Sequence, residues 1–240
     1  MQNRYAGDVG DFGKIGLLRA LEQEGLRVGV NWYLVGDESH NNDGKHVGYL
    51  NDKQYVDCDN ELLYLLSEMV LQKKRSVEQL ECLNALQTQR YYHRVIPLPN
   101  DIKGKARREW HKNAVEAMRG CDLVFLDPDN GLLPKSVGFG SAKSVKYVLS
   151  EEIIDYYKNG YSVVFYSHRT REQLDVYLER FMNLFCTKEL EEATIKGISF
   201  KRGTIRDYFF LIHKEHEEKC ISCLESFVKG KWGQHFSMIL

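Results

Sequence analysis

The chain has 240 residues, 43% of them hydrophobic, which is enough to bury one substantial core, so we expect a single domain over residues 1–240. With 33 Lys and Arg against 34 Asp and Glu, the formal charge is −1, which excludes a protein drawn to nucleic acid or an anionic membrane by its overall field. No apolar run approaches the roughly 18 residues of a spanning helix or marks a leader segment, so we expect a cytoplasmic protein without a membrane partner.

Hydrophobic periodicity and turn residues predict helices and strands that alternate along the chain. Helices are predicted over residues 12–24, 60–71, 76–90, 103–118, 150–158, 170–185 and 215–228. Strands are predicted over residues 28–35, 91–98, 122–127, 161–166, 193–201 and 206–213. This alternation predicts a Rossmann-like, doubly wound α/β fold, in which helices cover both faces of a mostly parallel sheet.

Ligands of such sheets bind beyond the carboxyl ends of the strands. The segments that follow three predicted strands are residues 37–46, 127–131 and 167–169. We therefore expect these three segments to converge at one rim of the sheet and to form the functional site.

The segment Asp127-Pro128-Asp129-Asn130-Gly131 concentrates two carboxylates and a carboxamide directly after an apolar strand. Proline stiffens such a turn and glycine permits positive φ, so turn propensity alone also accounts for these residue types. Placed at a strand end, Asp127, Asp129 and Asn130 are candidate catalytic residues, and His168 joins them because it follows the strand 161–166.

The loop 37–46 is almost entirely polar and follows the first strand. Its histidines and acids are the residue types used for general acid and base catalysis or for a divalent cation, although an exposed loop has the same composition. For a metal ion such as Mg²⁺ or Mn²⁺, the candidate ligands are Asp37, His40, Asp43, Asp127 and Asp129.

Two further segments carry charge near predicted helices. Asp11 is a plausible N-cap of the helix 12–24, and glycines around Asp8 and Lys14 make that helix end a candidate anion site. The helix 103–118 has a dense basic run that includes an indole, which is typical of nucleic-acid contact as well as of a solvated helix face. The candidate contacts to nucleic acid or a nucleotide are Lys103, Lys105, Arg107, Arg108 and Trp110.

The order of these features resembles Rossmann-type S-adenosylmethionine-dependent methyltransferases, in particular the bacterial large-subunit ribosomal-RNA adenine-N6 methyltransferases. Residues 5–12 are similar to the segment that leads into the first helix of that family, and Asp127-Pro128 matches the start of its Asp-Pro-Pro-Tyr motif. The end of the chain is also similar, with a helix, a strand, a turn containing Arg202-Gly203, a strand and a final helix. The resemblance implies a methyltransferase-like sheet with a C-terminal antiparallel strand.

The resemblance further implies S-adenosylmethionine as the cofactor. The residues placed to hold it are Asp8, Asp11, Lys14, Asp37, Glu38 and His40. The chain departs from the family in two places: the glycine-rich loop after the first strand is replaced by residues 37–46, and Asn130 stands where an aromatic residue stacks on the target base.

Three functions follow as alternatives. The first is methyl transfer to a nucleic acid or nucleotide, in which Asp127 and Asn130 orient the acceptor. The second is metal-dependent hydrolysis of a phosphodiester or nucleotide, and the third is non-catalytic binding of a nucleotide or nucleic acid on the same fold. On the sequence alone, Asp127→Asn is expected to abolish activity with little loss of stability.

Overall fold

The computed structural model describes residues 1–38, 44, 46–99, 104–169 and 172–240. A seven-stranded sheet runs through its centre in the order β2-β1-β3-β6-β8-β7-β9. Its strands are β1 (Val28–Asn31), β2 (Arg90–Tyr92), β3 (Leu123–Leu126), β6 (Ser162–His168), β7 (Thr194–Arg202), β8 (Thr204–Ile212) and β9 (Phe236–Met238). The first four in spatial order, β2, β1, β3 and β6, are parallel, which confirms the predicted Rossmann-like α/β fold.

The C-terminal part of the sheet is antiparallel. Strand β8 pairs antiparallel with both β6 and β7, and the turn between β7 and β8 contains Arg202 and Gly203. This hairpin confirms the predicted antiparallel addition to the parallel strands. The short β9 and a separate two-stranded sheet, β4 (Gly131–Leu132) with β5 (Tyr147–Val148), were not predicted because each strand is only two or three residues long.

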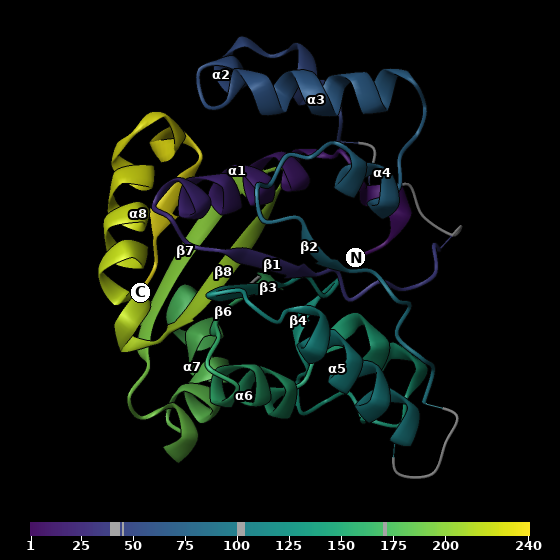
Figure 1. Cartoon of the computed structure of the whole chain (residues 1–240), viewed down its shortest axis with the longest axis vertical. Coiled ribbons are helices and arrows are strands. Elements are labelled where there is room, and N and C mark those ends of the chain that lie inside the picture. The colour runs from purple at the N-terminus through teal and green to yellow at the C-terminus, as the bar shows by residue number, and fades with distance from the viewer. Residues whose placement is uncertain (39–43, 45, 100–103, 170–171) are drawn as a thin grey trace.

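Helices cover both faces of the sheet (Figure 1). One face carries α1 (Val9–Gln23), α2 (Lys53–Val56), α3 (Asn60–Leu71), α4 (Val77–Cys82) and α8 (Glu217–Lys229). The other carries α5 (Lys105–Ala117), α6 (Ser150–Lys158) and α7 (Leu174–Phe185). Strands β1 and β3 are buried along their whole length between two hydrophobic clusters, one on each face, as expected for a doubly wound sheet. None of the described helices is both long and apolar enough to cross a membrane.

Several predicted boundaries were too long. The first strand stops at Asn31 because Tyr33 adopts a left-handed φ of 45°, although residues 32–35 continue buried. The predicted helix 76–90 ends at Cys82, before Asn84, which also has a positive φ. Positive φ at non-glycine residues has no strong sequence signal, so these endings could not be predicted.

His235 lies at the junction between the C-terminal segment and α2. Its ring is 1% exposed, stacks on Tyr55 at 4.6 Å, and accepts a hydrogen bond at Nδ1 from Arg202 Nε at 2.6 Å. Burial, and then the Arg202 charge, lower the pKa of His235. A protonated ring would have no lone pair for Arg202, so the folded protein holds His235 neutral.

We therefore expect acid to weaken the fold at this position. The contribution of neutral His235 is complete above the ordinary histidine pKa of about 6.5 and is lost as the pH falls through the lowered pKa of the folded state. Melting temperatures of the wild type and of His235→Gln, measured between about pH 7 and pH 5, should differ less at the acid end. A constant difference would show that His235 does not titrate on unfolding.

Candidate functional site

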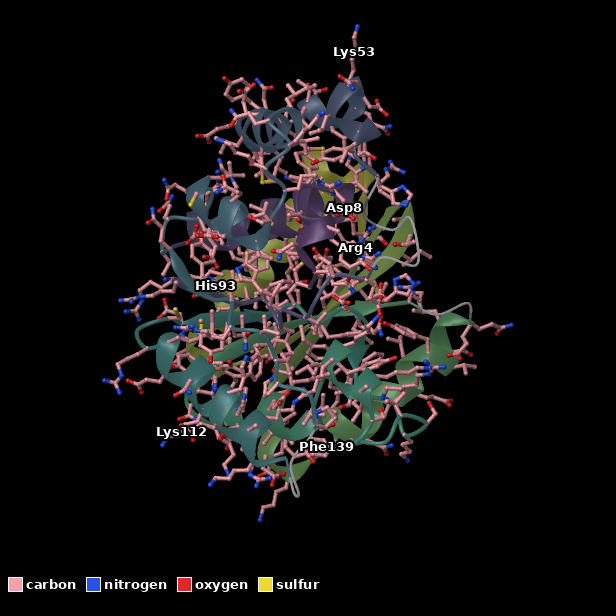
Figure 2. The ribbon with its side chains drawn as sticks, turned by 90° about the vertical axis from the view of Figure 1, so that its right-hand side faces the viewer. Arg4, Asp8, Lys53, His93, Lys112 and Phe139 are labelled. Carbon is pink, nitrogen blue, oxygen red and sulfur yellow. The ribbon has the colours of Figure 1, made fainter. Side chains whose placement is uncertain are left out.

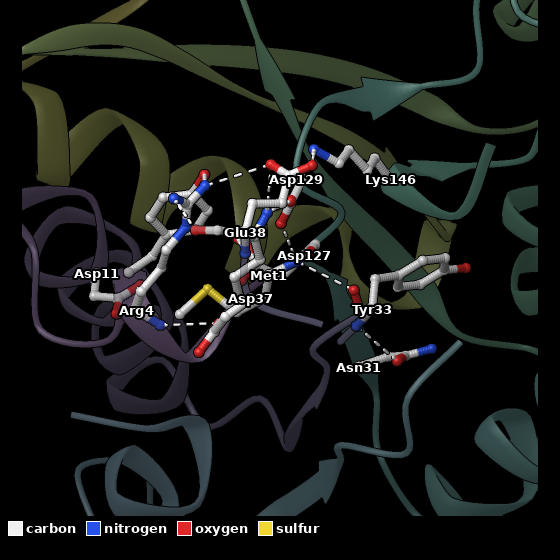
Figure 3. A network of polar contacts seen from close by, with 12 residues as sticks. Met1, Arg4, Asp11, Asn31, Tyr33, Asp37, Glu38, Asp127, Asp129 and Lys146 are labelled. Atoms are coloured by element: carbon white, nitrogen blue, oxygen red, sulfur yellow. Dashed lines mark hydrogen bonds and ion pairs between the residues drawn. The ribbon is translucent and has the colours of Figure 1, made fainter. Parts of the chain in front are cut away.

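A cavity of about 460 Å³ opens at the carboxyl ends of β3 and β6. Its wall is built by the start of α1, the segment after β1, the turn after β3, Lys146, and the facing ends of β6 and β8. Described residues from the expected 37–46 loop, Glu38, Gly44 and His46, line the same cavity as Asp127, Asp129 and Asn130. The predicted convergence of loops from separate parts of the chain is therefore present (Figure 3).

Asp127 lies in the wall as half of a buried ion pair. Lys14 Nζ donates to Asp127 Oδ2 at 2.6 Å and to Asp11 Oδ1 at 2.8 Å, and all three residues are at most 5% exposed. Burial raises the pKa of Asp127, while Lys14 acts to lower it. Burial acts to lower the pKa of Lys14, but the charges of Asp11 and then Asp127 outweigh it, so that pKa is raised.

This pairing corrects the expectation for Asp127→Asn. Breaking a buried ion pair leaves its other members without full compensation, so the substitution should lower stability as well as activity. We therefore expect the melting temperature of Asp127→Asn to be clearly lower than that of the wild type. We do not expect a loss of activity at an unchanged melting temperature.

Asp8, and not Asp11, caps helix α1. Asp8 Oδ1 accepts from the backbone N–H of Gly10 at 2.7 Å and of Asp11 at 3.1 Å, whereas Asp11 Oδ2 accepts from the Gly7 N–H at 2.8 Å. Helix α1 therefore begins at Val9, three residues earlier than predicted. The Asp8 carboxylate occupies the helix end that the sequence suggested for an anionic ligand, so a carboxylate of the chain itself fills that position.

Asp129 contacts the first residues of the chain. The Met1 ammonium lies 2.7 Å from Asp129 Oδ1 and donates to the backbone oxygens of Tyr33 and Asp127, and Gln2 Nε2 donates to Asp129 Oδ2 at 2.6 Å. Burial acts to raise the pKa of Asp129, but the ammonium outweighs it and the pKa is lowered. Asp129 is therefore ionised and already engaged.

Two neighbouring acids after β1 differ in position. Glu38 lines the cavity and forms ion pairs with Lys146 and Arg4, as Figure 3 shows. Asp37 is exposed and accepts from the Arg4 backbone N–H at 3.3 Å, outside the wall. Glu38 is thus the better placed of the two for a ligand.

Asn130 and His168 stand on adjacent strand ends, linked by a hydrogen bond from the His168 N–H to the Asn130 carbonyl at 3.3 Å. The Asn130 carboxamide lines the cavity and makes no hydrogen bond within the described part of the chain. The turn requires glycine at position 131, where φ is 105° and a Cβ would lie 2.4 Å from Ser167 Oγ. This turn therefore presents a polar amide to the cavity from a rigid position.

Sequence reasoning missed several residues of the wall. Arg206 and Tyr166 come from β8 and β6, and Lys146 ends a short 3-10 helix, so none follows a predicted strand end. Arg206 lies 3.6 Å from Asp8 Oδ2. One feature could have located Arg206 from the sequence. An antiparallel strand starts at the edge of the sheet where the parallel strands end, and β8 accordingly places Arg206 opposite His168.

A metal site receives no support from the described residues. Among them, no group of three or more His, Cys, Asp or Glu side chains could hold an ion. Asp127 and Asp129, both predicted ligands, are each engaged by a cation of the chain. Two other predicted ligands, His40 and Asp43, lie outside the described residues.

The predicted nucleic-acid helix was partly wrong. Arg107 is 5% exposed and pairs with Glu152 at 2.7 Å, and Trp110 is 5% exposed and donates to the Arg94 carbonyl, so neither can reach a phosphate or stack on a base. Lys105 and Arg108 are exposed, and Lys103 lies outside the described residues. Figure 2 shows that Lys112, an exposed residue of the same helix, lies far from Asp8 and Arg4.

No model of a known protein family matches the chain, and a search of curated proteins finds no match. The fold and the cavity are therefore the basis for any functional assignment.

Proposed function

We propose that this chain is a methyltransferase that uses S-adenosylmethionine and modifies a nucleic acid or a nucleotide. The observation that carries the proposal is the cavity at the carboxyl ends of β3 and β6, where residues 8–14, Glu38 and the Asp127–Asn130 turn meet. In doubly wound sheets this position binds cofactors, and the cavity volume lies within the range of small-molecule sites. The antiparallel hairpin of β7 and β8 agrees with the layout that the resemblance implies.

The wall has donor and acceptor groups that fit this cofactor. Asp8 presents a carboxylate suited to an ammonium group, and Glu38 lies after β1 where a ribose hydroxyl could bind. Asn130, whose carboxamide has no partner in the described chain, is the group we assign to the acceptor. When bound, the cofactor supplies a methyl group on a positively charged sulfur. The chain would then act by holding an acceptor in line with that methyl group, an orientation effect worth several kcal/mol.

Metal-dependent hydrolysis is the second candidate and has less support. It requires free carboxylates, whereas Asp127 and Asp129 face Lys14 and the Met1 ammonium. Non-catalytic binding is the third candidate. It predicts the same ligand binding as methyl transfer, but no methylated product.

Thermal-shift measurements would separate these candidates. We expect S-adenosylmethionine and S-adenosylhomocysteine to raise the melting temperature, because a ligand bound only by the folded state stabilises it, and Mg²⁺, Mn²⁺ and Zn²⁺ to have no such effect. Transfer of a labelled methyl group to RNA, DNA or nucleotides would then distinguish an enzyme from a binding protein. Stabilisation by a metal ion alone would favour the hydrolase instead.

The variant Asn130→Ala tests the acceptor side. Because the Asn130 side chain makes no hydrogen bond in the described chain, we expect an unchanged melting temperature and unchanged affinity for S-adenosylhomocysteine. Methyl transfer should fall by about tenfold or more, in line with the loss of one positioned polar contact in a transition state. Full activity of the variant would remove Asn130 from the acceptor site.

A further inference from the structure

The charged side chains in and beside the cavity wall are already paired with one another. Each acid has at least one cation at 3.6 Å or less. The acids are Asp8, Asp11, Glu38, Asp127 and Asp129, and the cations are Arg4, Lys14, Lys146, Arg206 and the Met1 ammonium. Within the described part of the chain, a charged group of a ligand therefore finds its counter-charges already engaged at this wall.

The two buried side-chain cations of the wall have little left to offer an anion. Lys14 Nζ donates to Asp11 and Asp127, and Arg206 Nη1 donates to two backbone carbonyls of the β7–β8 hairpin. A phosphate that entered the cavity would lose its hydration without gaining an uncommitted cation from these side chains, which is costly. The deep part of the cavity is therefore unsuited to a phosphate.

Two neutral groups of the wall, in contrast, have unused capacity for hydrogen bonds. The Asn130 carboxamide and the Tyr166 hydroxyl both line the cavity, and neither side chain forms a hydrogen bond within the described part of the chain. The carboxamide donates and accepts in one plane. Burial raises the pKa of Tyr166, so its hydroxyl keeps its proton and can donate.

Asn130 and Tyr166 lie at the same end of β6. The Asn130 carbonyl accepts from the His168 N–H at 3.3 Å, and the Asn130 N–H donates to the Lys146 carbonyl at 3.0 Å, so its backbone is held on both sides. Tyr166 precedes His168 by one strand repeat of about 7 Å and points to the same face of the sheet. The Tyr166 ring packs against Tyr208, with 6.1 Å between the ring centroids. This spacing lets Asn130 and Tyr166 contact one small planar group.

We infer that Asn130 and Tyr166 bind the acceptor through the uncharged edge of a nucleobase, and that the phosphates of the nucleotide or nucleic acid stay outside the cavity. This inference rests on the proposed function, which does not specify whether base, sugar or phosphate is recognised. A nucleobase edge carries neutral donors and acceptors in one plane, and asparagine is a common partner of such an edge. Asn130 and Tyr166 are then the residues that select the acceptor.

Ligand-observed NMR of the full chain without cofactor, at millimolar ligand, tests this inference. The probes are adenosine, guanosine, cytidine and uridine, each compared with its 5′-monophosphate. We expect at least one nucleoside to bind, and its 5′-monophosphate to bind with a Kd within about threefold of the same value. A phosphate held by a cation would lower the Kd by about tenfold or more. A difference of that size, or no binding by any nucleoside, would overturn the inference.

Tyr166→Phe removes the hydroxyl alone and should leave the melting temperature and the affinity for S-adenosylhomocysteine unchanged. The Kd of the nucleoside should rise by about three- to tenfold, as expected for the loss of one hydrogen bond. The matched control is Tyr161→Phe, at the opposite end of β6, where the hydroxyl donates to the Val115 carbonyl. Its nucleoside affinity should equal that of the wild type. If the two variants bind the nucleoside equally well, Tyr166 does not contact the base and the inference is wrong.

Failure of this inference can be distinguished from failure of the proposed function. Stabilisation by S-adenosylhomocysteine without nucleoside binding would overturn the inference alone. Nucleoside binding that Tyr166→Phe weakens, in a protein that neither S-adenosylmethionine nor S-adenosylhomocysteine stabilises, would support the base site and overturn the proposed methyl transfer.

Discussion

The variant Lys14→Met should unfold at a markedly lower temperature than the wild type and should lose ligand binding. Lys14 is 5% exposed, and its removal leaves Asp11 and Asp127 buried without the cation that both contact. Removing one member of a buried ion pair typically costs about 3–5 kcal/mol. For a chain of this length, that cost corresponds to a decrease of roughly 10 °C in the melting temperature.

A double variant controls for the loss of packing by the lysine stem. Lys14→Met combined with Asp127→Asn removes one of the stranded charges, so it should recover part of the stability lost in the single variant. If the stability losses of Lys14→Met and Asp127→Asn add up to the loss in the double variant, the two side chains are not coupled. Wild-type stability in Lys14→Met would show that neither carboxylate is ionised in the folded protein.

The second large effect is expected for Arg107→Met. Arg107 Nε donates to Glu152 Oε1 at 2.7 Å, and its other nitrogens donate to the carbonyls of Ser144 and Tyr147. The side chain therefore joins α5 to α6 and to the segment that carries Lys146. Its loss strands Glu152, and we expect a decrease of about 3–5 kcal/mol in the free energy of unfolding, measured by urea denaturation.

Lys112→Ala is the control from the same helix. Lys112 is exposed on α5, so its substitution should change the free energy of unfolding by no more than about 0.5 kcal/mol. Equal effects of the two variants would contradict a structural role for Arg107. This comparison also tests the correction made above, because an arginine that contacts nucleic acid would be dispensable for stability.

The sequence predicted the fold better than it predicted the state of the site. The apolar strands around Val30 and Phe125 and the alternating helices were sufficient for a doubly wound sheet, and its strand ends located Asp127 and Asn130. The sequence could not predict that Lys14 pairs with Asp127, because the two residues are 113 positions apart and no local pattern records such a contact. It also could not distinguish buried from exposed basic residues on α5, where Arg107 turns inward and Lys112 outward.

The contact between Asp8 and Arg206 joins two segments that are synthesised at very different times. Helix α1 leaves the ribosome early. Strand β8, which carries Arg206, is made only after most of the other elements, and synthesis proceeds at about 5–20 residues per second. A nascent chain therefore holds an unfinished pocket for roughly ten seconds or longer. Ligand binding can protect the newly made protein only after β8 has entered the sheet.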